Sequence, residues 1–270
     1  MHPQIGAVPA YVVGWALAIA LGGGGIVWLL RRAGLPVWQV GVVVGSLVAS
    51  VFIGSKLLYL LESWSQWFGN RGAFTAAVYS AHMRLPGGFL LMVAVTPAVA
   101  RLIGVRSLWL VDTFIPAVGL SVVGIRTGCF LEGCCYGTPS SLPWAVSFPA
   151  LSDVYWWQVQ QGLIPLDAKA SAPVHPLQVY FALAGLLIFL GLLSYQRRKR
   201  YDGELLVLFA LTFLWSTWTL ELLRARSHDF TREFTLLAAV AVGIAALVIE
   251  WRLRASERMA SASARAAVTS

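Results

Sequence analysis

Apolar segments that are about as long as a bilayer is thick recur along almost the whole chain. A helix needs roughly 20 apolar residues to cross the hydrocarbon core, and a backbone in lipid must satisfy its own hydrogen bonds. The segments run over residues 11–30, 39–61, 86–100, 108–125, 177–195, 205–223 and 234–251. The sequence therefore predicts an all-α integral membrane protein, a bundle of about seven transmembrane helices.

The composition leaves little room for a separate soluble domain. Hydrophobic residues make up 58% of the chain and charged residues 12%, far from the balance of a soluble domain. We therefore predict one transmembrane domain over residues 1–256, in which a surface loop covers about 126–176. The Ser- and Ala-rich residues 257–270 are expected to form a disordered tail.

Basic residues predict the orientation of the bundle, because loops rich in Lys and Arg stay in the cytoplasm. The densest basic cluster, residues 197–200, follows the fifth apolar segment, while Arg31 and Arg32 follow the first and Arg101 follows the third. The N-terminus is thus predicted outside and the C-terminus in the cytoplasm. The loop 126–176 then lies on the outer face, which in a bacterium is periplasmic. Since the net charge of +8 comes largely from cytoplasmic loops, it does not indicate a nucleic-acid partner.

Residues 124–137 are unusually polar and rich in glycine for a place where the chain leaves a membrane. This stretch contains Arg126, for which two interpretations are open. The guanidinium can reach the headgroups and anchor the helix end. Alternatively, its planar fork holds a lipid phosphate together with backbone amides that nearby glycines leave free, an interpretation that the number of glycines favours. These glycines are Gly124, Gly128, Gly133 and Gly137.

Several ionisable residues lie near or within the predicted spans. Burial would raise the pKa of Glu132 and make it a proton acceptor, but it is equally suited to pair with the arginine six residues earlier. Glu221 lies one helical turn before Arg224, so the two are predicted to form an ion pair that faces the protein interior. Lys56 and Asp112 lie deeper, where they are functional candidates or a structural pair.

The three cysteines of the chain, Cys129, Cys134 and Cys135, all belong to the same stretch. A zinc site usually combines a Cys-x2–4-Cys pair with a second pair or with histidines, which the sequence does not supply. Adjacent cysteines bridge each other poorly, whereas Cys129 is far enough from either neighbour to form a disulfide. We therefore predict no metal site and interpret the thiols as packing residues with at most one disulfide. A redox membrane protein is the weaker alternative.

Two histidines stand where the chain enters an apolar segment. His82 precedes the residues 86–88, Pro-Gly-Gly, and in an outward cleft it would be a natural general base near neutral pH. A lone histidine at an interface more often has no special role. His175, followed by Pro176, opens the fifth segment and is expected to have a modest structural role.

Taken together and in order, these residues resemble the prolipoprotein diacylglyceryl transferase family. They are similar to its Arg- and Gly-rich signature, the segment that follows, its His-Pro-x-Gln-Leu-Tyr-Glu motif, and a charged pair near the end of the sixth span. The matching positions are residues 124–137, residues 142–146, His175, Pro176, Gln178, Tyr180, Glu221 and Arg224.

The resemblance implies a multi-pass transferase of the bacterial inner membrane. Such an enzyme moves a diacylglyceryl group from phosphatidylglycerol to the lipobox cysteine of a prelipoprotein signal peptide, and glycerol phosphate leaves. This chemistry needs a base near the thiol and cations on the phosphate. The resemblance implies no cofactor, and we expect a monomer whose active site faces the periplasm.

The resemblance also implies roles for particular residues of this sequence. The catalytic positions would be His82 as the base, with Glu132 and Glu221 orienting it or relaying protons. The positions that bind the substrate phosphate would be Arg126, Arg224, Gly128, Gly133 and Gly137. Supporting positions would be Tyr136, His175 and Tyr180.

The chain departs from the family pattern and is a divergent member. A short insert separates His82 from the glycines that follow the family's histidine directly. Cys129 and Cys134 stand where Asn and Glu are frequent, Thr217 replaces an arginine, and Phe181 replaces the glutamate after the motif tyrosine. The alternative function is therefore a homologue that binds phospholipid or a membrane peptide without catalysis. A transporter is the least favoured class, because the polar residues gather at the outer face.

Overall fold

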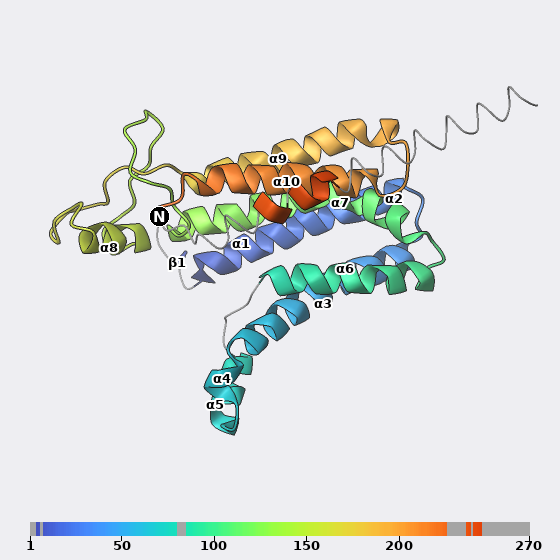
Figure 1. Cartoon of the computed structure of the whole chain (residues 1–270), viewed down its shortest axis with the longest axis horizontal. Coiled ribbons are helices and arrows are strands. Elements are labelled where there is room, and N and C mark those ends of the chain that lie inside the picture. Colours follow the sequence, from blue (N-terminus) through green and yellow to red (C-terminus); the bar gives the residue numbers. More distant parts are fainter. Residues whose placement is uncertain (1–3, 6–7, 80–84, 226–235, 239, 245–270) are drawn as a thin grey trace, which may run out of the picture.

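The computed structural model describes residues 4–5, 8–79, 85–225, 236–238 and 240–244 (Figure 1). Within these residues the chain is a bundle of helices whose long axes run roughly side by side. The strands of this part are β1 (Gln4–Ile5) and β2 (Val8–Pro9), which form a short antiparallel hairpin. The prediction of a helical fold is confirmed.

The bundle begins with one continuous helix made of α1 (Ala10–Ala18), the π-helical turn η1 (Ile19–Gly23) and α2 (Gly24–Arg32). The other long helices are α3 (Val37–Glu62), α6 (Leu85–Leu102), α7 (Ser107–Glu132), α9 (Leu177–Tyr195) and α10 (Glu204–Glu221). The short helices are α4 (Trp64–Trp67), α5 (Arg71–Tyr79), α8 (Asp153–Gln160) and η2 (Gln196–Arg198).

Five helices of the described part are long and apolar enough to cross a membrane. They correspond to the first, second, fourth, fifth and sixth predicted segments. The third predicted segment forms a shorter apolar helix, Gly87–Leu102, within α6. Of the seventh, residues 236–238 and 240–244 are described and are helical, and the tail 257–270 lies outside the described residues. A multi-pass helical membrane protein is thus confirmed, while seven spans and the orientation remain predictions.

Helix α7 is the central helix of the bundle. In its apolar window 50% of the residues are buried, whereas the share is at most 28% in the other four candidate spans. It packs against α1 and α2 on one side and against α9 and α10 on the other, and it lies between these helices in Figure 1. Its side chains Leu110, Phe114 and Ile115 are almost completely buried. The residues of α7 are therefore the best placed to form an enclosed site.

Helices α1 and α9 approach α7 closely at small residues. A Cβ atom added to Gly14 would lie 2.7 Å from Cα of Gly128, and one added to Gly124 would clash with the backbone of Ala18. A Cβ atom added to Gly185 of α9 would lie 2.7 Å from the carbonyl oxygen of Gly119. In lipid, helices associate through close van der Waals contact rather than through the hydrophobic effect, so small residues stabilise such crossings.

These contacts explain why the fourth span is longer than predicted. The expectation that it ends at Ile125 and that a loop begins at Arg126 is wrong, because α7 continues through Pro116 and ends at Glu132. Gly124 and Gly128 are buried where α7 contacts α1, and a Cβ atom on Gly124 would clash with the backbone of Ala18. Glycine richness here reflects helix packing and not a break in the helix.

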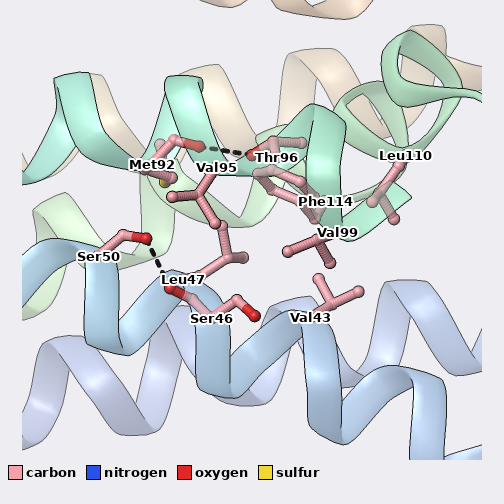
Figure 2. Close-up of a pocket in the computed structure, with 10 residues that line it drawn as sticks. All are labelled: Val43, Ser46, Leu47, Ser50, Met92, Val95, Thr96, Val99, Leu110 and Phe114. Carbon is pink, nitrogen blue, oxygen red and sulfur yellow. Dashed lines mark hydrogen bonds between the residues drawn. The ribbon is translucent and has the colours of Figure 1, made fainter. Parts of the chain in front are cut away.

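Helices α3 and α6 form a second closely packed pair. Between them and α7 lies a cavity of about 10 Å³, shown in Figure 2. The hydroxyl of Ser50 donates a hydrogen bond to the Ser46 carbonyl (2.7 Å), and that of Thr96 donates to the Met92 carbonyl (2.7 Å). A space of this size holds one water molecule at most, so it is not a lipid-binding site.

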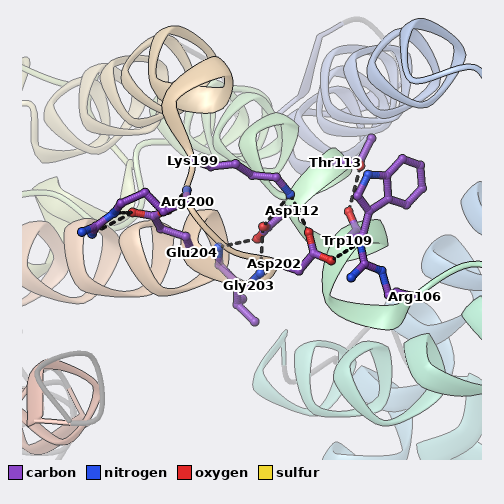
Figure 3. Close-up of polar contacts among 10 residues, drawn as sticks. Arg106, Trp109, Asp112, Thr113, Lys199, Arg200, Asp202, Gly203 and Glu204 are labelled. Atoms are coloured by element: carbon purple, nitrogen blue, oxygen red, sulfur yellow. Dashed lines mark hydrogen bonds and ion pairs between the residues drawn. The ribbon is translucent and has the colours of Figure 1, made fainter. Parts of the chain in front are cut away.

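A buried carboxylate ties the connection between α9 and α10 to the start of α7 (Figure 3). Asp112, only 1% exposed, accepts hydrogen bonds from the Lys199 ammonium (3.1 Å) and from the amides of Gly203 (2.8 Å) and Leu206 (3.1 Å). The predicted pairing of Asp112 with Lys56 is therefore wrong, because Lys56 donates instead to the Ala77 carbonyl (3.3 Å). The sequence did not predict that the loop between α9 and α10 packs against the start of α7.

Candidate active site

Three segments that are far apart in the sequence meet beyond the C-terminal end of α7. The Gly137 amide donates to the His175 carbonyl (3.0 Å), and the His175 amide donates to the Thr138 carbonyl (3.0 Å). The Thr138 amide donates to the Leu223 carbonyl (2.8 Å), and Gly137 pairs with Arg224 in an antiparallel bridge. These bonds join the end of α7, the start of α9 and the end of α10. The three motifs predicted separately thus form one site.

Arg126 lies in α7, less than two turns before the end of the helix. Its guanidinium carbon is 4.0 Å from the centre of the Phe181 ring, which is a cation–π contact with a buried residue of α9. Among the described residues, Arg126 has no carboxylate partner. An aromatic ring orients the guanidinium without neutralising it, so its charge and its donors remain available for an anion.

The predicted ion pair between Glu221 and Arg224 is confirmed. The Arg224 Nε lies 3.3 Å from the Glu221 Oε1, and the two side chains are 19% and 5% exposed. Because α10 ends at Glu221, Arg224 lies in the turn that follows, where its backbone pairs with Gly137. The pair therefore lies beside the glycine-rich motif. With a carboxylate this close, Arg224 is a weaker anion-binding group than Arg126.

Glu132 is the last residue of α7 and does not pair with Arg126. Six positions along an α-helix correspond to a rotation of about 240°, so the two side chains lie on different faces. Glu132 is half-buried and has no ion-pair partner within the part of the chain that the structure describes. The interpretation as a structural partner of Arg126 is therefore wrong. Its assignment as a proton acceptor stays a prediction.

The glycine amides do not form the expected anion-binding group. Gly128 is buried inside α7, the Gly133 amide donates to the Cys129 carbonyl (3.0 Å), and the Gly137 amide donates to the His175 carbonyl (3.0 Å). Gly133 has φ +80° and ends the helix, a backbone conformation that glycine adopts at no steric cost. A Cβ atom on Gly137 would lie 2.6 Å from Cβ of His175. These glycines therefore pack and turn the chain, and their predicted phosphate contacts through free amides are wrong.

The three cysteines lie together at the end of α7, Cys129 in its last turn and the other two just after it. They are free thiols whose sulfur atoms all lie within 4.8 Å of one another. Hydrogen bonds with Cys129 and Cys134, and also the positive charges of Arg126 and Arg224, lower the pKa of the Cys135 thiol well below its ordinary value, although burial acts against this. The Cys135 thiol is therefore the most acidic of the three.

His175 and Tyr180 form a polar contact at the entrance to α9. The His175 Nδ1 lies 3.3 Å from the Tyr180 hydroxyl, which also accepts a hydrogen bond from the Trp144 indole (2.7 Å). These two contacts join the start of α9 to the surface segment that follows α7. The supporting roles of His175 and Tyr180 stay predictions.

Three residues of the site were not predicted as site residues. The buried Gln178 donates a hydrogen bond through Nε2 to the Cys134 carbonyl. The Phe181 ring makes the cation–π contact with Arg126, and the Trp144 indole donates a hydrogen bond to the Tyr180 hydroxyl. All three residues lie in or beside segments that match a family motif, so the motifs could have identified them as site residues. The sequence did not predict which residue each one contacts, because every one of these contacts joins residues far apart in the chain.

Two predicted site positions remain, Tyr136 and His82, and the structure describes only the first of them. Tyr136 is buried against Phe148, Val154 and Val174, and its ring lies 5.7 Å from that of Trp157. Tyr136 therefore packs against the surface segment after α7, and its supporting role in the site stays a prediction. His82 lies outside the described residues.

The open space at the far end of the bundle is not part of this site. A cavity of about 470 Å³ lies between the end of α2 and the end of α9, with Arg32 and Arg197 among its lining residues. These residues belong to the helix ends opposite to the three motifs. This cavity therefore lies apart from the residues of the three motifs.

Comparison with known proteins agrees with the motifs. The family model of prolipoprotein diacylglyceryl transferase matches residues 3–261. Three similar proteins are each described as a phosphatidylglycerol–prolipoprotein diacylglyceryl transferase. The protein from Solidesulfovibrio magneticus is 28% identical over 238 residues, which cover 83% of each chain. The one from Nitrosospira multiformis is 27% identical over 228 residues, covering 80% of this chain and 68% of its own.

The third of these proteins is more distant in identity but spans a comparable length. It comes from Finegoldia magna and is 23% identical over 200 residues, which cover 73% of this chain and 72% of its own. The family match extends over nearly the whole chain and includes all three motifs that meet at the end of α7. The chain belongs to the prolipoprotein diacylglyceryl transferase family.

Proposed function

We propose that this membrane transferase moves a diacylglyceryl group from phosphatidylglycerol to the lipobox cysteine of a prelipoprotein, and that the reaction takes place where the three motifs meet. In this reaction the cysteine sulfur forms a bond to the glyceryl carbon of the lipid. The bond between that carbon and the phosphate oxygen breaks, the thiol proton passes to a base, and glycerol phosphate leaves. The enzyme must therefore stabilise a phosphate that gains negative charge.

The observation that carries the proposal is the position of Arg126. Its guanidinium is held on the Phe181 ring without a carboxylate partner among the described residues, at the place where the motifs converge. A planar guanidinium binds two phosphate oxygens at once, and a fixed one loses little freedom when it does so. Arg224 supplies a second positive charge, which Glu221 holds in place.

The proposed proton acceptor is the histidine that the resemblance to the family motifs indicates. We assign His82 as the base for the incoming thiol, and Glu132 and Glu221 as groups that orient it or relay the proton. Glu132 is half-buried at the end of α7, and Glu221 is buried beside Arg224, so both border the site. The supporting residues Tyr136, His175 and Tyr180 hold the surface segment and the start of α9 in place.

The site is proposed to face the periplasm of a bacterial inner membrane. The basic residues 197–200 and Arg106 lie near the Asp112 network, at the start of α7, whereas the site lies at its other end. The positive-inside rule places the basic end in the cytoplasm, which puts the site on the opposite side, where lipobox cysteines are presented. We further propose that a single copy of the chain, with residues 1–256 as its membrane domain, suffices for the reaction.

The proposal is tested by substituting Arg126 and measuring transfer of labelled diacylglycerol from phosphatidylglycerol vesicles to a lipobox peptide. Arg126→Ala is expected to lower the rate by about 100-fold or more, as loss of a charge-stabilising donor does elsewhere. Arg126→Lys should recover part of this loss, because an ammonium supplies the charge but not the fork. Arg71→Ala, at an exposed position, is the matched control. Transfer by Arg126→Ala at the wild-type rate would contradict the proposed role.

A second function, binding without catalysis, is favoured by one observation. The residue under Arg126 is Phe181, where the family motif has a glutamate. A homologue without catalytic activity would retain phosphatidylglycerol during purification but release no glycerol phosphate when the peptide is added. Release of glycerol phosphate in step with peptide lipidation supports the transferase and excludes this alternative.

A further inference from the structure

We propose that Cys129, Cys134 and Cys135 form a binding site for a soft metal ion, Cu⁺ in particular. This proposal is independent of the transferase reaction, because none of its steps uses these thiols. The three sulfur atoms come from both sides of the helix end and lie within 4.8 Å of one another. Thiolates are the protein ligands that select Cu⁺ and Zn²⁺ over harder ions.

The spacing of the sulfur atoms suits a shared ion. Metal–sulfur bonds of about 2.3 Å place three sulfurs roughly 4 Å apart around one ion. The observed separations are at most 4.8 Å, so the side chains need to close by less than about 1 Å.

The backbone holds the cysteines in this arrangement before any ion binds. Gly133 turns the chain at the end of α7, and the Cys134 amide donates to the Cys129 carbonyl (3.1 Å), which closes the turn. The Cys134 carbonyl in turn accepts a hydrogen bond from the buried Gln178 of α9. Two of the three ligands are therefore attached to each other, and the turn is attached to a second helix.

Cys135 provides a separate indication. Its φ is +59°, in the left-handed region that a side chain with a Cβ atom rarely adopts. Glycine or asparagine would relieve this conformation, but a cysteine occupies the position. Disfavoured backbone conformations occur most often where a side chain has a function, and here the conformation directs the Cys135 sulfur toward the other two.

The number of ligands favours Cu⁺. The cluster supplies three sulfur atoms, which are enough for Cu⁺. Zn²⁺ needs a fourth ligand, which the cluster does not supply among the described residues. Therefore Cu⁺ is expected to bind more tightly than Zn²⁺.

The experiment uses the full chain purified in detergent without oxygen, stripped of metal with a chelator and then given Cu⁺ or Zn²⁺. The metal bound per chain is measured by inductively coupled plasma mass spectrometry. The number and type of ligand atoms are measured by X-ray absorption spectroscopy at the copper edge. We expect one Cu⁺ per chain, bound to three sulfurs, and weaker retention of Zn²⁺. Zn²⁺ binding as tight as that of Cu⁺ would overturn the assignment to Cu⁺.

Two kinds of variant separate loss of the site from loss of the fold. Cys129→Ser and Cys134→Ser each remove one ligand and should weaken Cu⁺ binding by about tenfold or more. Cys135→Gly removes the third ligand and also relieves the positive φ, so it should unfold no earlier than wild type on heating while losing Cu⁺. Undiminished Cu⁺ binding in these variants, or a disulfide between two of the thiols in the anaerobic protein, would overturn the proposal.

Discussion

The guanidinium of Arg126 lies over the ring of Phe181, with 4.0 Å between the guanidinium carbon and the ring centre. The two residues belong to α7 and α9 and are joined by no backbone hydrogen bond, so the contact depends on how these helices pack. Where the family motif has a glutamate, this chain has an uncharged ring. Arg126 is therefore oriented by an aromatic ring and has no carboxylate partner among the described residues.

Replacing the ring should weaken the binding of phosphatidylglycerol. Phe181→Leu keeps an apolar side chain but removes the cation–π contact, which is worth about 0.5–2 kcal/mol. We expect the Kd for phosphatidylglycerol vesicles to rise about 2- to 30-fold, because Arg126 is no longer held in one orientation. Phe209→Leu, at another buried position, is the control for packing and should leave this Kd unchanged. An equal effect in both variants would attribute the change to packing alone.

The contact between α1 and α7 predicts a sharp difference between two glycines. Gly124→Ala places a methyl group against the backbone of Ala18, which has little room to move, so the variant should be destabilised by about 1–3 kcal/mol. Gly45→Ala adds the same methyl group to an exposed position of α3 with no atom within 4 Å. Its free energy of unfolding should be equal or slightly higher, because alanine favours the helix. Thermal unfolding in detergent measures both, and equal melting temperatures would contradict the close contact.

The Asp112 network predicts a loss of stability without a loss of chemistry. Asp112→Ala leaves two backbone amides without their acceptor, which should cost about 1–3 kcal/mol. The Lys199 ammonium keeps its ion pair with Asp202. Fourteen helical residues, or about 21 Å, separate Asp112 from Arg126 along α7, so the folded fraction should transfer lipid at the wild-type rate. Asp167→Ala, in an exposed loop, should affect neither quantity. A lower rate per folded molecule would show that the network reaches the site.

The lowered pKa of Cys135 predicts its reactivity toward iodoacetamide. Because hydrogen bonds from Cys129 and Cys134, with help from Arg126 and Arg224, favour the thiolate, alkylation of Cys135 should change little between about pH 6 and 8. An ordinary thiol reacts about tenfold faster for each pH unit in this range. The pKa of Cys134 is raised by its hydrogen bond with Cys129, so it should react slowly throughout. Fragment mass spectrometry distinguishes the two residues.

A variant shows whether the arginine contributes to this effect. Arg126→Ala removes a positive charge near the Cys135 sulfur, so the thiolate loses stabilisation and the pKa rises toward the ordinary value. The midpoint of the alkylation rate should then shift to higher pH than in wild type, although the hydrogen bonds with Cys129 and Cys134 remain the larger cause of the lowered pKa. Equal midpoints in the two proteins would show that the charge of Arg126 does not act on Cys135.

Most of the fold follows from local properties of the chain. Segments such as 177–195 are long and apolar enough to be helical in lipid whatever they pack against, and α9 begins and ends at the predicted residues. The end of a helix cannot be predicted from the local sequence where it depends on packing against a neighbouring helix. The end of α7 was predicted seven residues too early, because glycines that look like a loop are accommodated by the close approach of α1.

The site shows the same division. Residue types and motif order single out Arg126, Glu221 and Arg224 as candidates, since a charge is costly in a membrane unless it has a function or a partner. The ion pair between Glu221 and Arg224 was predictable, because side chains three residues apart lie about one helical turn from each other. The partner of Asp112 was not, because Lys199 comes from a loop far along the chain.

The sequence by itself determined that this protein is a helical membrane protein of one family and which charged residues belong to its motifs, because length, hydropathy and residue order are local. Only the tertiary structure decided what surrounds those residues. It placed the ring of Phe181 under Arg126, used the amides of Gly133 and Gly137 for its own turns, and brought the three cysteine sulfurs together. Each of these depends on which helix faces meet, and packing between distant segments settles that.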